Sequence, residues 1–136
     1  YSSDISSDKI IDESIKVMQL VKKLEAQGYR VNVDVAFGSS ADGREIAASI
    51  RVKSANVRLQ VSKLAFPLVH PSMLRRLMFR YIEVNKNVKK GYVDGYGSPV
   101  MWERMKQLLP DSIVIPAIWN VDIDKINTLE QIKGVV

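Results

Sequence analysis

A helical stripe followed directly by two strand-like segments constrains the fold more than any other feature of this sequence. From Asp8 onward, apolar residues recur at spacings of three and four, as on the buried face of an amphipathic helix. These residues are Ile10, Ile11, Val17, Met18, Val21 and Leu24. Acidic residues begin the stretch and lysines end it, which complements the helix dipole, and Gly28 is placed to stop the helix. We therefore predict a helix from Asp8 to just before Gly28.

Two segments after this helix alternate between apolar and polar or small residues, as strands with one buried face do. The apolar positions are Val31, Val33, Val35 and Phe37 in the first segment and Ile46, Ala48, Ile50 and Val52 in the second. The polar stretch GSSADGR between them contains Asp42-Gly43, which is a hairpin signal. The two strands are therefore expected to be antiparallel neighbours.

The second half of the chain favours helices with one further strand. Pro67 and Pro71 interrupt the segment 57–88, so we expect a break before Ser72 and a helix after it. The predicted buried stripe of that helix is Met73, Leu74, Leu77, Met78, Tyr81 and Ile82. The arginines of this stretch are expected to face outward.

The remaining segments are assigned from turn signals and apolar runs. GYVDGYGSP, residues 91–99, is rich in glycine and predicts a loop, and VMWERMKQLL predicts a short helix. SIVIPAI reads as a short buried strand that contains Ile113 and Ile115. A final short helix is expected from near Asp122 or Asp124.

This order of elements predicts an α/β fold, in which a mixed sheet with an antiparallel strand pair is flanked by helices. If a parallel strand precedes the first helix, the order is similar to the opening of the von Willebrand factor A domain, a Rossmann-like fold. The length of 136 residues, with 46% hydrophobic and 26% charged residues, fits a single domain over residues 1–136. Because the chain does not begin with Met, we expect it to be a fragment of a longer protein.

Several kinds of chemistry are excluded or disfavoured by composition. The chain has no cysteine, which excludes a disulfide framework, a thiolate zinc site and a cysteine nucleophile. His70 is the only histidine, and we interpret it as a capping or packing residue rather than a general base. No apolar run approaches the roughly 20 residues of a membrane helix. We expect no catalytic residue, no cofactor and no membrane partner.

The stretch DISSD, from Asp4 to Asp8, resembles the metal-binding signature of von Willebrand A domains, in which carboxylate and hydroxyl oxygens hold Mg²⁺. The match is imperfect, since Asp8 replaces the final serine. Aspartate and serine at a helix start are also expected for capping alone, and we favour this interpretation. A metal-dependent site here stays a third hypothesis, and no metal ligand is assigned.

Charge is the most informative functional feature. Residues 44–90 contain eleven Lys or Arg against only Glu45 and Glu83, a net charge of +9, whereas each flank sums to −2 and the whole chain to +5. We call residues 44–90 the basic segment. The candidate binding residues are Arg51, Lys53, Arg75, Arg76, Arg80, Lys89 and Lys90, with Tyr92 and Tyr96 as stacking surfaces. Arg58 belongs with Arg51 and Lys53 near the end of the second strand, and Lys86 belongs with Lys89 and Lys90 beyond the helix.

The basic segment supports two functional hypotheses. The leading one is a non-catalytic module that binds another protein or assembles with copies of itself. The alternative is a nucleic-acid-binding domain, because Lys and Arg that neutralise phosphates release counterions. The simplest interpretation is a solvated face with local pairs, such as Arg80 with Glu83 across one helical turn.

Three stretches resemble a family of uncharacterised proteins encoded by tailed bacteriophages. They are VKKLEAQGYRVNVDV, IRVKSANVRLQV and KLAFPLVHPSMLRRLMFRYIE. The shared positions, over about residues 15–85, are Leu24, Glu25, Gly28, Val31, Val52, Lys53, Phe66, His70, Pro71, Leu74, Arg75 and Arg76. The resemblance implies a phage or prophage origin, with the host cytoplasm or the virion as location, and it implies no catalytic role.

Overall fold

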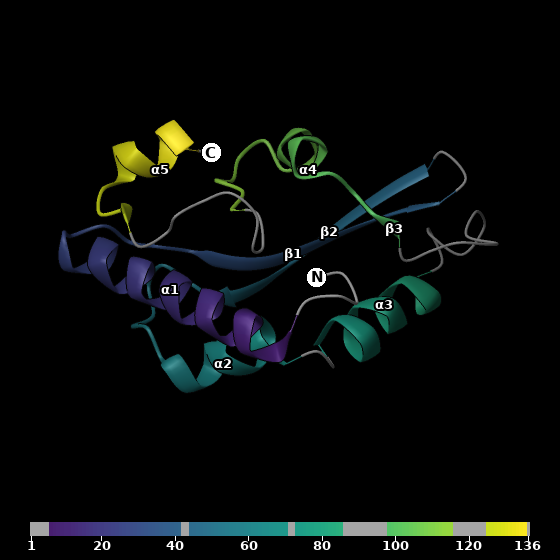
Figure 1. Cartoon of the computed structure of the whole chain (residues 1–136), viewed down its shortest axis with the longest axis horizontal. Coiled ribbons are helices and arrows are strands. Elements are labelled where there is room, and N and C mark those ends of the chain that lie inside the picture. Colours follow the sequence, from purple (N-terminus) through teal and green to yellow (C-terminus); the bar gives the residue numbers. More distant parts are fainter. Residues whose placement is uncertain (1–5, 42–43, 71–72, 86–97, 116–124, 136) are drawn as a thin grey trace.

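An antiparallel sheet with helices on both faces forms the frame of the molecule (Figure 1). The computed structural model describes residues 6–41, 44–70, 73–85, 98–115 and 125–135. Strands β1 (Val33–Ala41) and β2 (Arg44–Lys53) pair over their whole length, and the short β3 (Ser98–Pro99) pairs with the other edge of β1. The α/β fold with an antiparallel strand pair flanked by helices is thus confirmed, and every described strand pairing is antiparallel.

Helix α1 (Ser7–Ala26) begins and ends where its capping signals lie. The Ser6 side chain accepts a hydrogen bond from the Lys9 N–H at 3.4 Å. At the other end, Tyr29 N–H donates to the Leu24 carbonyl at 3.2 Å, and Gly28 has a φ of 93°. This is a Schellman ending, which needs a residue that tolerates positive φ. The predicted helix is confirmed.

The buried face of α1 differs from the predicted stripe at its flanks. Met18, Val21 and Leu24 are buried as expected, whereas Ile11 remains 39% exposed. Leu20, which the stripe omitted, is buried because a second helix packs on this flank. That helix is α5 (Leu129–Val135), whose Ile132 joins Leu20 and Leu24 in one apolar cluster.

The alternation in the hairpin is confirmed for β1, where Phe37 is buried and Val33 and Val35 are half-buried. The alternation in β2 is interrupted at its end. Val33 pairs with Lys53, but Asp34 pairs with Arg51, so Val52 is an extra residue in a β-bulge. Because side chains alternate between faces, one extra residue moves Lys53 to the same face as Val33.

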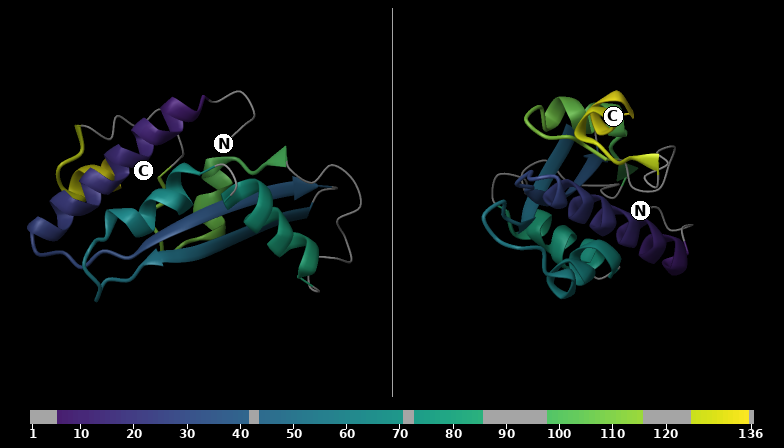
Figure 2. Two further views of the ribbon diagram at one scale, coloured as in Figure 1. Left: turned by 90° about the horizontal axis from the view of Figure 1, so that it is seen from below. Right: turned by 90° about the vertical axis from the view of Figure 1, so that its left-hand side faces the viewer.

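The two faces of the sheet carry different helices (Figure 2). On one side lie α1, α2 (Val61–Val69) and the helical segment after it, whose methionines pack on Phe37. On the other side lies α4 (Trp102–Leu108), next to Gly38. A Cβ atom at Gly38 would lie 2.6 Å from the Met105 sulfur and 2.7 Å from the Val100 Cβ. Glycine at this position therefore allows the close approach of α4.

The helix after Pro71 differs from the predicted one in its first turns. Met73–Met78 is a π-helix, η1, and Phe79–Val84 is the α-helix α3. Met73, Met78 and Ile82 are buried, but Leu77 is 51% exposed and Tyr81 49% exposed. The prediction that Leu77 and Tyr81 face the core is wrong. In the π-helix, hydrogen bonds run from residue i to i+5, so each turn contains more residues than in an α-helix, and Met73 and Met78 come onto one face.

Three other segments correct the sequence prediction. Pro67 lies inside α2, in its last turn, where the ring removes only one hydrogen bond. Ser98–Pro99, expected in a loop, pairs with β1 as β3. Residues 112–115 form no strand; Ile113 is 43% exposed, and Ile115 instead fills the apolar cluster between α1 and α5.

The last helix begins later than predicted. Residues 125–128 are not α-helical, and α5 starts after Thr128. Thr128 Oγ1 accepts from the Gln131 N–H at 3.3 Å, and Gln131 Oε1 accepts from the Thr128 N–H at 3.2 Å. This reciprocal capping box sets the start of the helix at the TLEQ sequence, a signal that the prediction overlooked.

Substituting Gly38 by Ala tests the packing of α4 on the sheet. The added methyl group must displace Met105 and Val100, so Gly38→Ala should lower the free energy of unfolding by about 1–3 kcal/mol in urea titration. Ala36→Ser, at an exposed position of the same face, is the control and should change stability by less than about 0.5 kcal/mol. Equal stability of the two variants would contradict this packing.

Candidate functional site

The structure divides the described part of the basic segment into two groups. Arg51, Lys53 and Arg58 come together where β2 ends and α2 begins, and Lys63 joins them there. In the sequence, Lys63 contributes only to the total charge of the basic segment. Three further arginines, Arg75, Arg76 and Arg80, lie on η1 and α3. The side chain of Arg75 and the whole of Lys86, Lys89, Lys90, Tyr92 and Tyr96 lie outside the described residues.

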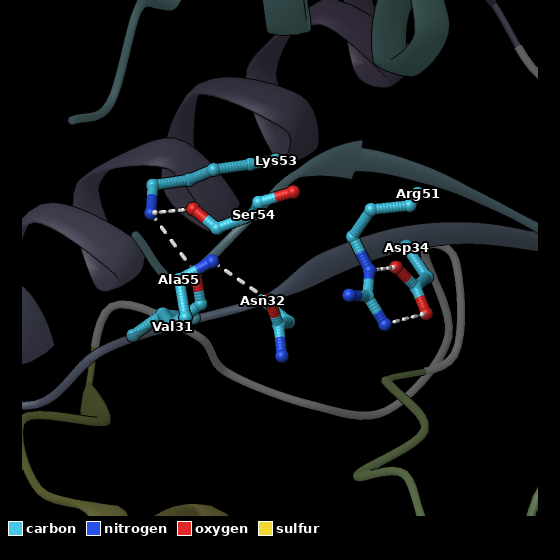
Figure 3. A network of polar contacts seen from close by, with 7 residues as sticks. All are labelled: Val31, Asn32, Asp34, Arg51, Lys53, Ser54 and Ala55. Atoms are coloured by element: carbon cyan, nitrogen blue, oxygen red, sulfur yellow. Dashed lines mark hydrogen bonds and ion pairs between the residues drawn. The ribbon is translucent and has the colours of Figure 1, made fainter. Parts of the chain in front are cut away.

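Arg51 is held by its cross-strand neighbour. Its guanidinium binds the Asp34 carboxylate in a two-point contact, in which Nε donates to Oδ1 and Nη2 donates to Oδ2 at 3.1 Å (Figure 3). The hydrogen bond with Asp34 raises the pKa of Arg51 above its ordinary value, and the nearby carboxylate charge adds to this effect while desolvation opposes it. Arg51 therefore stays charged, but a carboxylate of its own chain neutralises it.

Lys53 lies in the interior rather than on the surface. Its side chain is 3% exposed, and Nζ lies 2.5 Å from Oε1 of Glu25 on α1. The ammonium also donates to the Val31 carbonyl at 2.9 Å and to the Ser54 carbonyl at 3.2 Å (Figure 3). These three acceptors match the three N–H groups of a lysine. Lys53 was a candidate binding residue of the basic segment, but its ammonium is buried and bound within the chain, because the bulge at Val52 turns it inward.

The surface of η1 and α3 combines arginines with apolar side chains. Arg76 and Arg80 are exposed, as predicted. Leu77, Tyr81 and Val84 follow at spacings of four and three and are 51%, 49% and 54% exposed. We call these five residues the α3 surface. Such spacing places the three apolar residues along one side of a helix.

The Arg80–Glu83 pair predicted across one helical turn is present, with Nη1 and Oε2 at 3.4 Å. Both side chains are largely exposed, at 70% and 43%. Exposed ion pairs of this kind contribute little to stability, because water and salt screen them. The guanidinium of Arg80 is therefore accessible to a partner at little energetic penalty.

His70 and Asp8 fit the structural roles expected for them. The exposed His70 ring stacks on Phe66 with a centroid distance of 5.2 Å and an interplanar angle of 28°. Asp8 lies in the first turn of α1, next to the capping Ser6. Within the described ranges, no group of three or more His, Asp or Glu side chains is arranged to share a metal ion. Asp4 lies outside them.

These features define an α/β protein with a basic and partly apolar helical surface. The chain belongs to the family described as Domain of unknown function (DUF7192), which matches residues 1–135. Neither a curated protein nor a solved structure is significantly similar to it. Among the described helices, none is both long and apolar enough to cross a membrane.

Replacing Lys53 by Met tests the interior ion pair. Lys53→Met leaves the Glu25 carboxylate and the Val31 carbonyl without their donor and should lower the free energy of unfolding by about 3 kcal/mol. This is the lower end of the range for buried pairs, because Glu25 keeps 23% side-chain exposure. Urea titration measures the change.

A double-mutant cycle separates the ion pair from other effects. Glu25→Gln in the Lys53→Met background should be less destabilising than Glu25→Gln alone, because the carboxylate no longer has a cation to lose. Lys22→Met, at an exposed position of α1, is the matched control. Stability of Lys53→Met equal to that control would contradict the buried pair.

Proposed function

We propose that this protein is a non-catalytic module that binds an acidic protein partner through the α3 surface. The observation that carries the proposal is the alternation of exposed Arg76 and Arg80 with exposed Leu77, Tyr81 and Val84. Arginine and tyrosine are enriched among the residues that dominate the binding energy of protein interfaces. The arginines select for carboxylates, and the apolar stripe supplies area to bury.

The same observation favours a protein over a nucleic acid. Phosphate backbones are recognised chiefly by cations and hydrogen-bond donors, which would leave Leu77 and Val84 without a role. The net charge of +5 opposes close contact between two copies of the basic segment, which favours a different, acidic protein. The cross-linking test described below distinguishes binding of a different protein from self-assembly.

The proposal also includes the origin that the sequence resemblance implies. A phage-encoded module of this kind would meet its partner in the host cytoplasm or in the virion. Arg75, Lys89 and Lys90 extend the basic character of the α3 surface along the sequence.

A photo-reactive residue in place of Tyr81 tests the α3 surface in the source cells. We expect a specific cross-linked adduct with one protein, lost when Arg76→Glu and Arg80→Glu are introduced together, because charge reversal repels an acidic partner. The same residue at Gln19, an exposed position of α1, should give no such adduct.

Mass spectrometry of the adduct identifies the partner. An adduct between two copies of this chain would show that the α3 surface serves self-assembly rather than binding of an acidic partner. An adduct that persists in the Arg76→Glu/Arg80→Glu variant, or forms equally from position 19, would contradict the proposal.

The excess positive charge of the basic segment supports nucleic-acid binding as a second candidate function. Fluorescence anisotropy with labelled single- and double-stranded DNA and RNA tests it. Affinity that falls steeply between about 50 and about 200 mM salt would establish phosphate contacts and favour this second candidate. Under the leading proposal, we expect weak binding that Leu77→Ser and Val84→Ser leave unchanged.

A further inference from the structure

A small basic pocket lies where β2 leads into α2, away from the α3 surface. Its lining comes from the end of β2, the following loop and the first turn of α2, and its volume is about 170 Å³. The charged lining residues are Arg51, Lys53, Arg58 and Lys63, with no carboxylate among them. Ser54 and Gln60 add polar groups, and Val57 and Leu64 add apolar ones. All these residues lie in the described part of the chain.

Two of the four cations are already used by the protein itself. Arg51 binds Asp34, and the Lys53 ammonium binds Glu25 and two carbonyl groups. Arg58 and Lys63 are exposed, and neither forms an ion pair with any described carboxylate. The pocket therefore keeps an excess charge of two, contributed by Arg58 and Lys63.

The start of α2 adds to this positive field. Gln60 occupies the N-cap position with an extended backbone, and no side chain caps the helix there. The Lys63 N–H already donates to the Gln60 carbonyl at 3.0 Å, and Val61 and Ser62 do not line the pocket. The start of α2 therefore contributes the partial positive charge of a helix N-terminus rather than amide donors aimed into the pocket. No acidic residue lies in the first turn of α2, and Lys63 lies there instead. A cation at this end of a helix is unfavourable unless an anion binds beside it.

The size of the pocket limits what it can hold. Cofactor and drug-sized sites occupy about 300–1,000 Å³, well above this volume. A single tetrahedral anion with a few waters is a better match, since one water occupies about 30 Å³. A phosphate monoester carries a charge of about −1.5 to −2 at neutral pH, which balances Arg58 and Lys63.

We infer that the pocket between β2 and α2 is a binding site for a phosphoryl group, held by Arg58 and Lys63 at the uncapped start of α2. The buried Lys53 and the paired Arg51 form its wall and do not bind the anion through their charged groups. This site shares no residue with the α3 surface, so the inference does not depend on the proposed function.

Titration of the whole chain with inorganic phosphate, followed by amide NMR at constant ionic strength, tests the inference. We expect saturable shifts confined to the residues from Ser54 to Leu64, with a Kd in the millimolar range or tighter. The double variant Arg58→Met/Lys63→Met should bind at least about tenfold more weakly, because charge-assisted hydrogen bonds are lost. Both residues are exposed, so the variant should keep the fold.

A matched pair controls for general loss of charge. Arg30→Met/Lys22→Met removes one exposed arginine and one exposed lysine elsewhere and should leave the phosphate Kd within about twofold. Absence of saturable shifts in the wild-type chain would overturn the inference. Shifts that are equal in the wild type and in Arg58→Met/Lys63→Met would overturn it as well.

The source of the phosphoryl group is read from a comparison of three probes. Inorganic phosphate, O-phosphoserine and a nucleoside 5′-monophosphate present the same anion on different carriers. Equal Kd values would assign recognition to the phosphoryl group alone. Tighter binding of O-phosphoserine would indicate a phosphorylated protein as the ligand, and tighter binding of the nucleoside monophosphate would indicate a nucleotide. Either result also supports the site.

Discussion

The contact between Lys53 and Glu25 ties the long helix to the hairpin, and the rest of the arrangement depends on it. The Lys53 ammonium contacts three parts of the chain. It binds Glu25 on α1, the Val31 carbonyl just before β1 and the Ser54 carbonyl just after β2. A buried charge is tolerated only when it is paired and fully hydrogen-bonded. The relative positions of α1, β1 and β2 must therefore be maintained closely, because any displacement would leave a desolvated charge.

The bulge that turns Lys53 inward also sets the electrostatics of the surface beside it. With Lys53 and Arg51 both paired, Arg58 and Lys63 supply the positive charge at the start of α2 that no carboxylate in the described part of the chain neutralises. On η1 and α3, the π-turn has a comparable effect, because it brings apolar side chains such as Leu77 out to solvent beside arginines. Two local irregularities of the backbone thus produce the two surfaces to which we assign binding.

Short-range sequence patterns correctly predicted the elements whose formation depends on interactions between residues close together in the chain. The Gly28 ending follows from the need for positive φ, and the alternation of β1 follows from the pleat. The run around Ile113 was misread as a strand, because burial against helices and burial within a sheet produce the same apolar pattern. The start of α5 at Leu129 was readable in principle, since its capping box is a local signal.

The sequence by itself determined the helix–hairpin frame, the α/β class and the concentration of positive charge in residues 44–90, because each depends on neighbours within a few positions. Only the tertiary structure decided which cations are available. Asp34 and Glu25 lie far from Arg51 and Lys53 along the chain and meet them through strand pairing and a bulge. The register of two strands and the packing of a helix on them are non-local properties, and the availability of a charge depends on what the fold brings within hydrogen-bonding distance.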